Sequence, residues 1–87
     1  MAISFPNASR SYDPDGQRVR FWGHDSASEV QFFLEQDALF KLDPKTRNNE
    51  AGMLATFDAR LDRIHSVART MYSGGRKTFY TLVATDF

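Results

Sequence analysis

The sequence predicts an α+β fold: a small, mostly antiparallel sheet in β-β-α-α-β order with two helices packed on one face, in a single domain over residues 1–87. Three observations support this prediction. A strictly alternating segment follows a turn sequence near the N-terminus, apolar residues recur at helical spacing in the second half, and a short aromatic and β-branched run lies near the C-terminus. Strands grouped apart from helices indicate α+β layering.

The first third of the chain is expected to form strands. A short strand is predicted at residues 3–5. Residues 13–16, Asp-Pro-Asp-Gly, favour a hairpin turn, because Asp opens the turn, Pro presets φ and Gly accepts a positive φ. In the strand that follows, residues 18–24, alternation places Val19 and Phe21 on the face that we expect to meet the core.

The first helix is predicted to begin at Ser26. Ser26 and Glu29 have the spacing of a capping box, in which each side chain bonds a backbone N–H group of the first turn. Pro44 ends this helix. Phe32 and Leu39 are seven residues apart and would share the side that faces away from the sheet. The stripe expected to face the sheet is Ala27, Val30, Phe33, Leu34 and Ala38.

The second helix is predicted to run from Asn49, a suitable N-cap, to about Tyr72, because Gly74 and Gly75 then allow the left-handed backbone that closes a helix. At about 1.5 Å per residue it would be roughly 35 Å long, so either one end overhangs the sheet or rests on a partner, or the helix contains a kink. The last strand is expected at residues 78–84. The helix residues expected to pack on Val19 and Phe21 are Leu54, Phe57, Leu61, Ile64, Ala68 and Met71.

The composition excludes several classes of protein. The chain has no cysteine, so it offers no disulfide framework, thiolate zinc site or thiol nucleophile, and we expect a reducing compartment, the cytoplasm. Eleven basic and eleven acidic residues cancel, which argues against a surface built throughout to bind phosphates. The first ten residues lack the pattern of a secretory signal, and no apolar stretch is long enough to span a bilayer, so no membrane partner is expected.

Three short motifs contain reactive or ligating side chains, and each has a structural explanation. His24 and Asp25 suggest a general base, but neighbours on a strand face opposite ways, so a turn or capping role for Asp25 is favoured. Asp62 and His65 share a helical face, as a metal pair or a surface ion pair would. Residues 74–77, Gly-Gly-Arg-Lys, resemble an anion nest, although a helix C-cap explains both glycines. We therefore expect no catalytic residue, metal or cofactor.

The polar face of the strand at residues 18–24 is the most specific candidate for binding. It combines aromatic and cationic side chains, the chemistry of a stacking platform for single-stranded nucleic acid. The favoured alternative is that the N-terminal segment or another subunit covers this face and buries Trp22. The candidate binding surface consists of Arg18, Arg20, Trp22 and His24, with Arg76 and Lys77 as further cations.

The chain resembles, over essentially its whole length, a family of small bacterial proteins called domain of unknown function 1488. The resemblance implies a compact α+β fold in a bacterial cytoplasm, and it brings no established activity, cofactor or catalytic residue. The residues that carry it are Phe5-Pro6, Ser9-Arg10-Ser11-Tyr12-Asp13, Val19-Arg20-Phe21-Trp22-Gly23-His24-Asp25-Ser26, Phe32-Phe33, Glu50-Ala51-Gly52, Phe57-Asp58, Ile64-His65 and Asp86-Phe87.

The function expected from the sequence is that of a non-enzymatic interaction module, acting on a protein partner or as a homo-oligomer such as a homodimer. Phe32 and Leu39 are the candidate oligomer interface. The alternative is a nucleic-acid-binding regulator, and an enzyme ranks third. Nucleic-acid binding requires the arginine-bearing strand face to merge with Arg76 and Lys77 into one exposed basic surface, whereas a protein interface requires an apolar patch.

Overall fold

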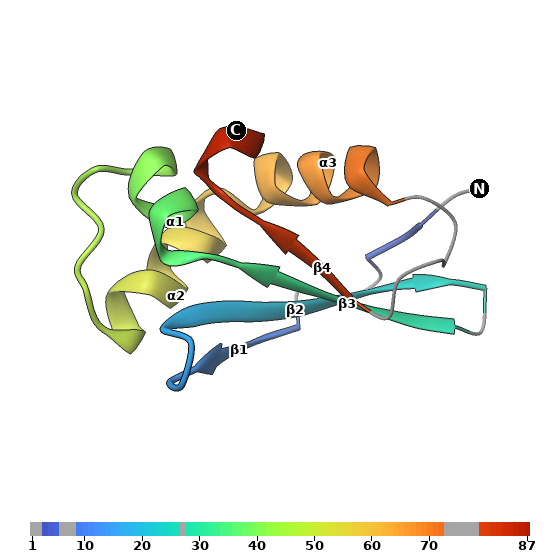
Figure 1. Cartoon of the computed structure of the whole chain (residues 1–87), viewed down its shortest axis with the longest axis horizontal. Helices are drawn as coiled ribbons and strands as arrows, with labels where there is room; N and C mark the ends of the chain where they lie inside the picture. The colour runs from blue at the N-terminus through green and yellow to red at the C-terminus, as the bar shows by residue number, and fades with distance from the viewer. Residues whose placement is uncertain (1–2, 6–8, 27, 73–78) are drawn as a thin grey trace.

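The computed structural model describes residues 3–5, 9–26, 28–72 and 79–87. One four-stranded sheet in the order β1-β2-β3-β4 lies beneath the helices (Figure 1), and only the last pair of strands, β3 and β4, is parallel. The fold is therefore α+β, with a mixed and mostly antiparallel sheet, as predicted. The elements are β1 (Arg10–Asp13), β2 (Arg18–Asp25), β3 (Ser28–Leu34), α1 (Gln36–Leu42), α2 (Glu50–Ala59), α3 (Leu61–Met71), β4 (Phe79–Leu82) and a 3₁₀ turn (Ala84–Asp86).

The hairpin between β1 and β2 is confirmed. The carboxylate of Asp13 opens the turn by accepting from the backbone N–H of Asp15 at 3.2 Å. The left-handed residue is Gln17, with φ of 51°, and not Gly16 as predicted. In β2, Val19 and Phe21 are completely buried, so the predicted alternation of this strand is also correct.

The prediction of a helix from Ser26 is wrong, because residues 28–34 form strand β3. Ser26 lies in the turn with φ of 56°, and β3 then pairs antiparallel with β2 along its length. Val30, Phe32 and Leu34 are buried at every second position, which is the period of a strand. Pairing with β2 outweighed the local capping signal, so the order is β-β-β-α-α-α-β and a third strand separates the hairpin from α1.

The predicted long helix is two helices, α2 and α3, broken at Arg60, whose φ of −114° and ψ of 23° are not helical. The predicted cap is present, because Asn49 Oδ1 accepts from the backbone N–H of Gly52 at 2.7 Å. A break was one of the two expectations for so long a segment. Helix α3 ends at Met71, and the predicted closing glycines lie outside the described residues.

The core lies between the sheet and the helices and is rich in aromatic rings. Phe21 stacks on Phe32 with ring centroids 5.1 Å apart and meets Phe57 of α2 at 5.3 Å. The predicted packing of the helical seam on β2 is confirmed for Phe57, which contacts Phe21, and the other seam residues belong to the same core. Phe57, Ile64 and Ala68 are fully buried, while Leu54, Leu61 and Met71 are partly buried at the margin of the same core.

The proposed oligomer interface at Phe32 and Leu39 is wrong. Phe32 faces the core from β3, Leu39 faces it from α1, and neither has any exposed surface. Their seven-residue spacing placed them on one side of a helix that does not exist. These two residues are part of the interior and cannot meet another subunit in the folded chain.

Residues 3–5 extend the sheet beside the far end of β2. Ser4 and His24 exchange two backbone hydrogen bonds of 2.9 and 2.8 Å, and Ile3 is buried. Gly23 lies directly beneath this segment: a Cβ atom there would lie 2.8 Å from Phe5 Cε1 and 2.9 Å from Ile3 Cδ1. The absence of a side chain at Gly23 therefore lets the N-terminal segment close over the core.

In the parts of the chain that the structure describes, none of the helices is both long and apolar enough to cross a membrane.

Candidate interaction surface

The face of the sheet opposite the helices is called the outer face here, and it is the candidate site. Residues paired across neighbouring strands share a face, so the inward-facing Val19 and Phe21 fix which side chains point outward. Arg18, Arg20, Trp22 and His24 form one outward row on β2, as the sequence predicted. Their neighbours on the outer face are Ser11 and Asp13 from β1, Glu29, Gln31 and Phe33 from β3, and Phe79 and Thr81 from β4.

Arg18 is neutralised within the chain. Its Nε donates to Asp13 Oδ2 and its Nη1 donates to Glu35 Oε2, each at 3.0 Å. The guanidinium carbon also lies 3.9 Å from the centroid of the Phe33 ring. The bonds to Glu35 and Asp13 raise the pKa of Arg18, and the same guanidinium lowers the pKa of the Asp13 carboxyl. Arg18 therefore orders one end of the outer face and offers little free charge.

Arg20 differs from Arg18 because no carboxylate lies within ion-pair distance of it in the described residues, which include all eleven Asp and Glu. Its Nη2 donates to Ser11 Oγ at 3.4 Å, and its guanidinium carbon lies 5.3 Å from the centroid of the Trp22 ring. The Nε atom is buried and has no hydrogen-bond partner. A buried donor without a partner is costly, and because the chain itself covers Nε, an external acceptor can meet only the terminal nitrogens of this guanidinium.

Three aromatic side chains supply the apolar part of the outer face. Phe33 meets Phe79 edge to face with ring centroids 5.5 Å apart, and Trp22 lies one strand from Phe33. Phe79 is 49% exposed, although large apolar side chains are usually covered. Neither Phe33 nor Phe79 was predicted from the sequence, because Phe33 was assigned to a helix and Phe79 reaches this face only through the parallel pairing of β4 with β3. On β3, Phe33 pairs with Arg20 and lies diagonally from Trp22.

The described part of the outer face is not basic. Two arginines stand against Asp13, Glu29 and Glu35, and one of those arginines is already paired twice. The other predicted cations, Arg76 and Lys77, lie outside the described residues. The described part of this surface therefore has the aromatic component of a stacking platform without an excess of positive charge.

His24 and Asp25 point to opposite faces of β2. His24 lies on the outer face, whereas the Asp25 carboxylate accepts a hydrogen bond from the hydroxyl of Tyr72, at the end of α3. That bond raises the pKa of Tyr72 to about 12. Asp25 thus ties the hairpin between β2 and β3 to a helix, which is a structural role.

Asp62 and His65 do not form an ion pair. His65 is buried and stacks on the ring of Phe5, with centroids 4.1 Å apart and planes 8° from parallel, while Asp62 is exposed. Burial is the main cause that lowers the pKa of His65, and the neighbouring Arg69 adds to it. Among the described residues, no group of three or more His, Cys, Asp or Glu side chains is arranged to hold a metal ion.

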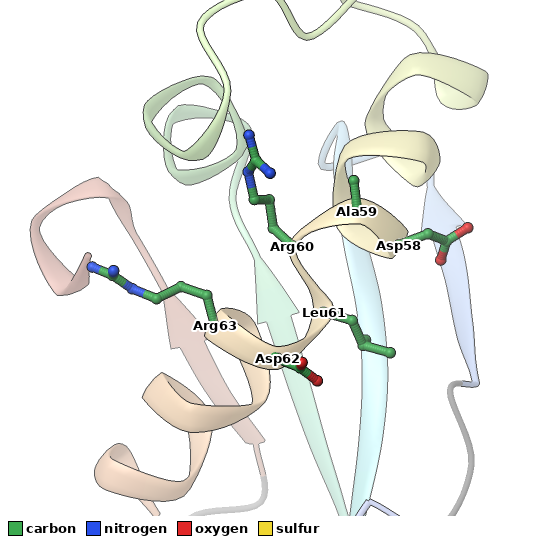
Figure 2. Close-up of a pocket in the computed structure, with 6 residues that line it drawn as sticks. All are labelled: Asp58, Ala59, Arg60, Leu61, Asp62 and Arg63. Carbon is green, nitrogen blue, oxygen red and sulfur yellow. The ribbon is translucent and has the colours of Figure 1, made fainter.

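Among the described residues, two hollows lie near the junction of α2 and α3. One, of about 420 Å³, is lined by residues 58–63, and Figure 2 shows that Arg60 and Arg63 extend to one side of it while Asp58 and Asp62 extend to the other. Asp58 is held by Arg10 at 2.9 Å. The second hollow, of about 300 Å³, is lined by Lys41, Leu42, Arg60, Arg63 and Phe87. Neither hollow brings an acid, a base and a nucleophile together, so the outer face is the stronger candidate.

Comparison with known proteins adds a family without an assigned activity. No curated protein and no solved structure gives a significant match to this chain. The model of one family matches residues 3–83, which include the whole sheet, all three helices and every described residue of the outer face. The chain therefore belongs to the family described as "Protein of unknown function (DUF1488)".

Proposed function

We propose that this protein is a non-enzymatic interaction module that binds a protein surface through the outer face of its sheet. The observation that carries the proposal is that Trp22 and the contacting pair Phe33 and Phe79 share one face of the sheet, which none of the described helices covers. Sheets of α+β domains bury one face under helices, and an aromatic cluster on the other face marks a site of association. Aromatic and arginine side chains are also the residues enriched at protein interfaces.

The charges of the outer face favour a protein over a nucleic acid as partner. Binding to a phosphate backbone depends on several unpaired cations, because the affinity comes from counterion release. Arg18 is occupied by Asp13 and Glu35, and Glu29 adds a further negative charge to the face. A nucleic acid remains the second candidate, since Trp22 and Arg20 are adjacent and both are suited to stacking on a base.

The non-enzymatic part of the proposal is supported by what the titratable side chains do. Asp25 accepts a hydrogen bond from Tyr72, His65 is stacked on Phe5, and Asp58 is paired with Arg10. Each of these groups stabilises the fold. The cysteine-free composition suits a reducing compartment, so we place this binding activity in the cytoplasm.

A photo-crosslinker placed on the outer face tests the proposed function in living cells. Gln31 is the outward neighbour of Trp22 on β3, and Gln31→p-benzoylphenylalanine would put the reactive ketone within the aromatic cluster. Ser66, exposed on α3, is the matched control position on the helical side. Protein adducts at position 31 and none at position 66 are expected. Adducts to nucleic acid, or no adduct at position 31, would contradict binding to a protein surface.

A salt titration separates the two candidate partners in vitro. Emission of Trp22, the single tryptophan, reports directly on the outer face. We expect no change in emission when single-stranded or duplex oligonucleotides are added at low salt. An oligonucleotide-dependent change that weakens steeply with salt, and that Arg20→Gln reduces, would support the nucleic-acid alternative instead.

A further inference from the structure

We infer that the partner of the outer face is a second copy of this chain, packed sheet to sheet about a twofold axis that crosses the strands at Trp22. The inference rests on the proposed function and names the partner. It starts from the two charged residues of the outer face that lack an ion pair within the described chain, Arg20 and Glu29.

The register of the sheet places these two residues on opposite sides of one row. Trp22 pairs with Gln31, and Gln31 pairs with Phe79, so these three side chains form a row across the sheet. Arg20 lies two residues from this row along β2, and Glu29 lies two residues from it in the opposite direction along β3. At about 3.3 Å per residue, each charge is about 6.6 Å from the row.

A twofold axis along this row would bring oppositely charged side chains of the two copies together. Rotation about the axis keeps the row in place and exchanges its two sides, so Arg20 comes to face the partner subunit's His24 and Glu29, which are paired with each other. Strands are about 4.8 Å apart, which a guanidinium on a long side chain spans. Because the interface is isologous, the pair between Arg20 and the partner's Glu29 forms twice.

The same axis brings the aromatic side chains of both copies together. Trp22 lies opposite the partner's Trp22 and Phe79 opposite the partner's Phe79, in a layer about 10 Å thick, as between the sheets of a sandwich. The partner's Glu29 also supplies a carboxylate acceptor for the terminal nitrogens of Arg20, which has no ion pair within the described chain. A twofold axis along β2 would instead set Arg20 against its own copy, so the charges select the axis across the strands.

Charge reversal at these two positions tests the inference. Sedimentation of the wild-type chain over a concentration series is expected to show a dimer. Arg20→Glu would place two pairs of facing carboxylates at the interface, and Glu29→Arg would place two pairs of facing guanidiniums there. In both variants the facing groups carry the same charge and repel. Each variant is expected to remain folded by circular dichroism and to weaken the dimer roughly tenfold or more. Glu50→Arg, the same charge change on the exposed surface of α2, is the control and should leave the dimer intact.

Mixing the two single variants provides the decisive measurement. In a mixed dimer both pairs again join opposite charges, one in the native sense and one with its signs exchanged, so an equimolar mixture of Arg20→Glu and Glu29→Arg chains should recover the wild-type mass. The double variant Arg20→Glu/Glu29→Arg should recover it alone. If Arg20→Glu does not fold, the neutral variants Arg20→Gln and Glu29→Gln are compared instead. Each removes one charge of the proposed pair without adding a like charge.

The outcomes distinguish this inference from the proposed function. A wild-type chain that remains monomeric at high micromolar concentration while position 31 crosslinks to a different protein overturns the inference and leaves the proposed function standing. A monomer without protein adducts contradicts both. A dimer that neither single variant weakens, or that the mixture does not restore, overturns the pairing of Arg20 with the partner's Glu29.

Discussion

Gly23 is the residue at which a single added methyl group has the clearest expected effect. Gly23→Ala would place Cβ against Phe5 and Ile3 at less than 3 Å, so the N-terminal segment must shift or the β2 backbone must move. Overpacking of this kind destabilises by about 1–3 kcal/mol. The midpoint of urea denaturation measures this loss of stability. In a Phe5→Ala background, which makes room, the same change should cost less; an equal cost in both backgrounds would contradict this account.

His65 should make stability fall in acid. Its folded-state pKa is lowered, chiefly by burial, so folding favours the neutral ring. The contribution is complete above the unfolded pKa of about 6.5 and is lost as the pH falls through the lower folded value. Urea unfolding at pH 7.5 and pH 5 should show this loss, and His65→Phe should reduce it. Ser66→Ala, at an exposed position of the same helix, is the matched control and should leave the pH dependence in place.

Tyr72 should produce the opposite trend in alkali. Its pKa is raised to about 12, mainly because its hydroxyl donates to Asp25. Folding favours the protonated phenol, so the contribution is complete below the unfolded pKa of about 10 and is lost as the pH rises through the folded value. Thermal unfolding between pH 9 and 12 should be less pH-dependent in Tyr72→Phe than in wild type. Equal slopes would exclude this contribution.

At the scale of single elements, the cap of α2 gives a direct test of a sequence prediction. Asn49 accepts a hydrogen bond from the N–H of Gly52, and Asn49→Ala should cost about 1 kcal/mol. Asn49→Asp keeps an acceptor at the same position and should preserve most of the stability. Chemical denaturation of the three chains measures the difference. If Asn49→Asp were as unstable as Asn49→Ala, capping would not be the cause.

The elements that were predicted correctly are those whose structure is determined by a pattern within their own sequence. The turn at residues 13–16, the alternation of β2 and the helical seam of residues 54–71 are all local patterns. Strand β3 was missed because Ser26 and Glu29 imitate a helix cap, and because two adjacent phenylalanines blur its period of two. Pairing with a distant neighbour decides its state, which no local pattern contains.

The part of the candidate site that lies on β2 was predictable from the sequence, and the part on β3 and β4 was not. Four of its residues lie on β2, and the sequence identified that row, including Trp22. Phe33 and Glu29 could have been added only after β3 was recognised as a strand. Phe79 required the parallel pairing of β3 with β4, which joins segments separated by three helices. The side of the sheet that the helices leave free is likewise a property of the tertiary fold.

In the whole molecule, the sheet and the helices share one core. Phe32 and Leu39, which were predicted from the sequence to face outward, should therefore be essential to the stability of the fold. Leu39→Ala should destabilise by about 2–5 kcal/mol, because Leu39 is completely buried. Leu42→Ala, on the same helix but only partly buried, should cost less. Guanidinium denaturation measures both. A near-wild-type midpoint for Leu39→Ala would show that the packing of α1 differs from that described.

The parallel pairing of β4 with β3 has a consequence for the order of folding. Phe32 and Tyr80 are register partners from opposite sides of the helical segment, so their contact closes a large loop, and such contacts form late in slow-folding topologies. Until then the fourth strand is absent from the sheet, and Phe79 cannot meet Phe33. The complete aromatic cluster exists only in a fully folded chain, so a partner that requires all three rings would discriminate finished molecules from folding intermediates.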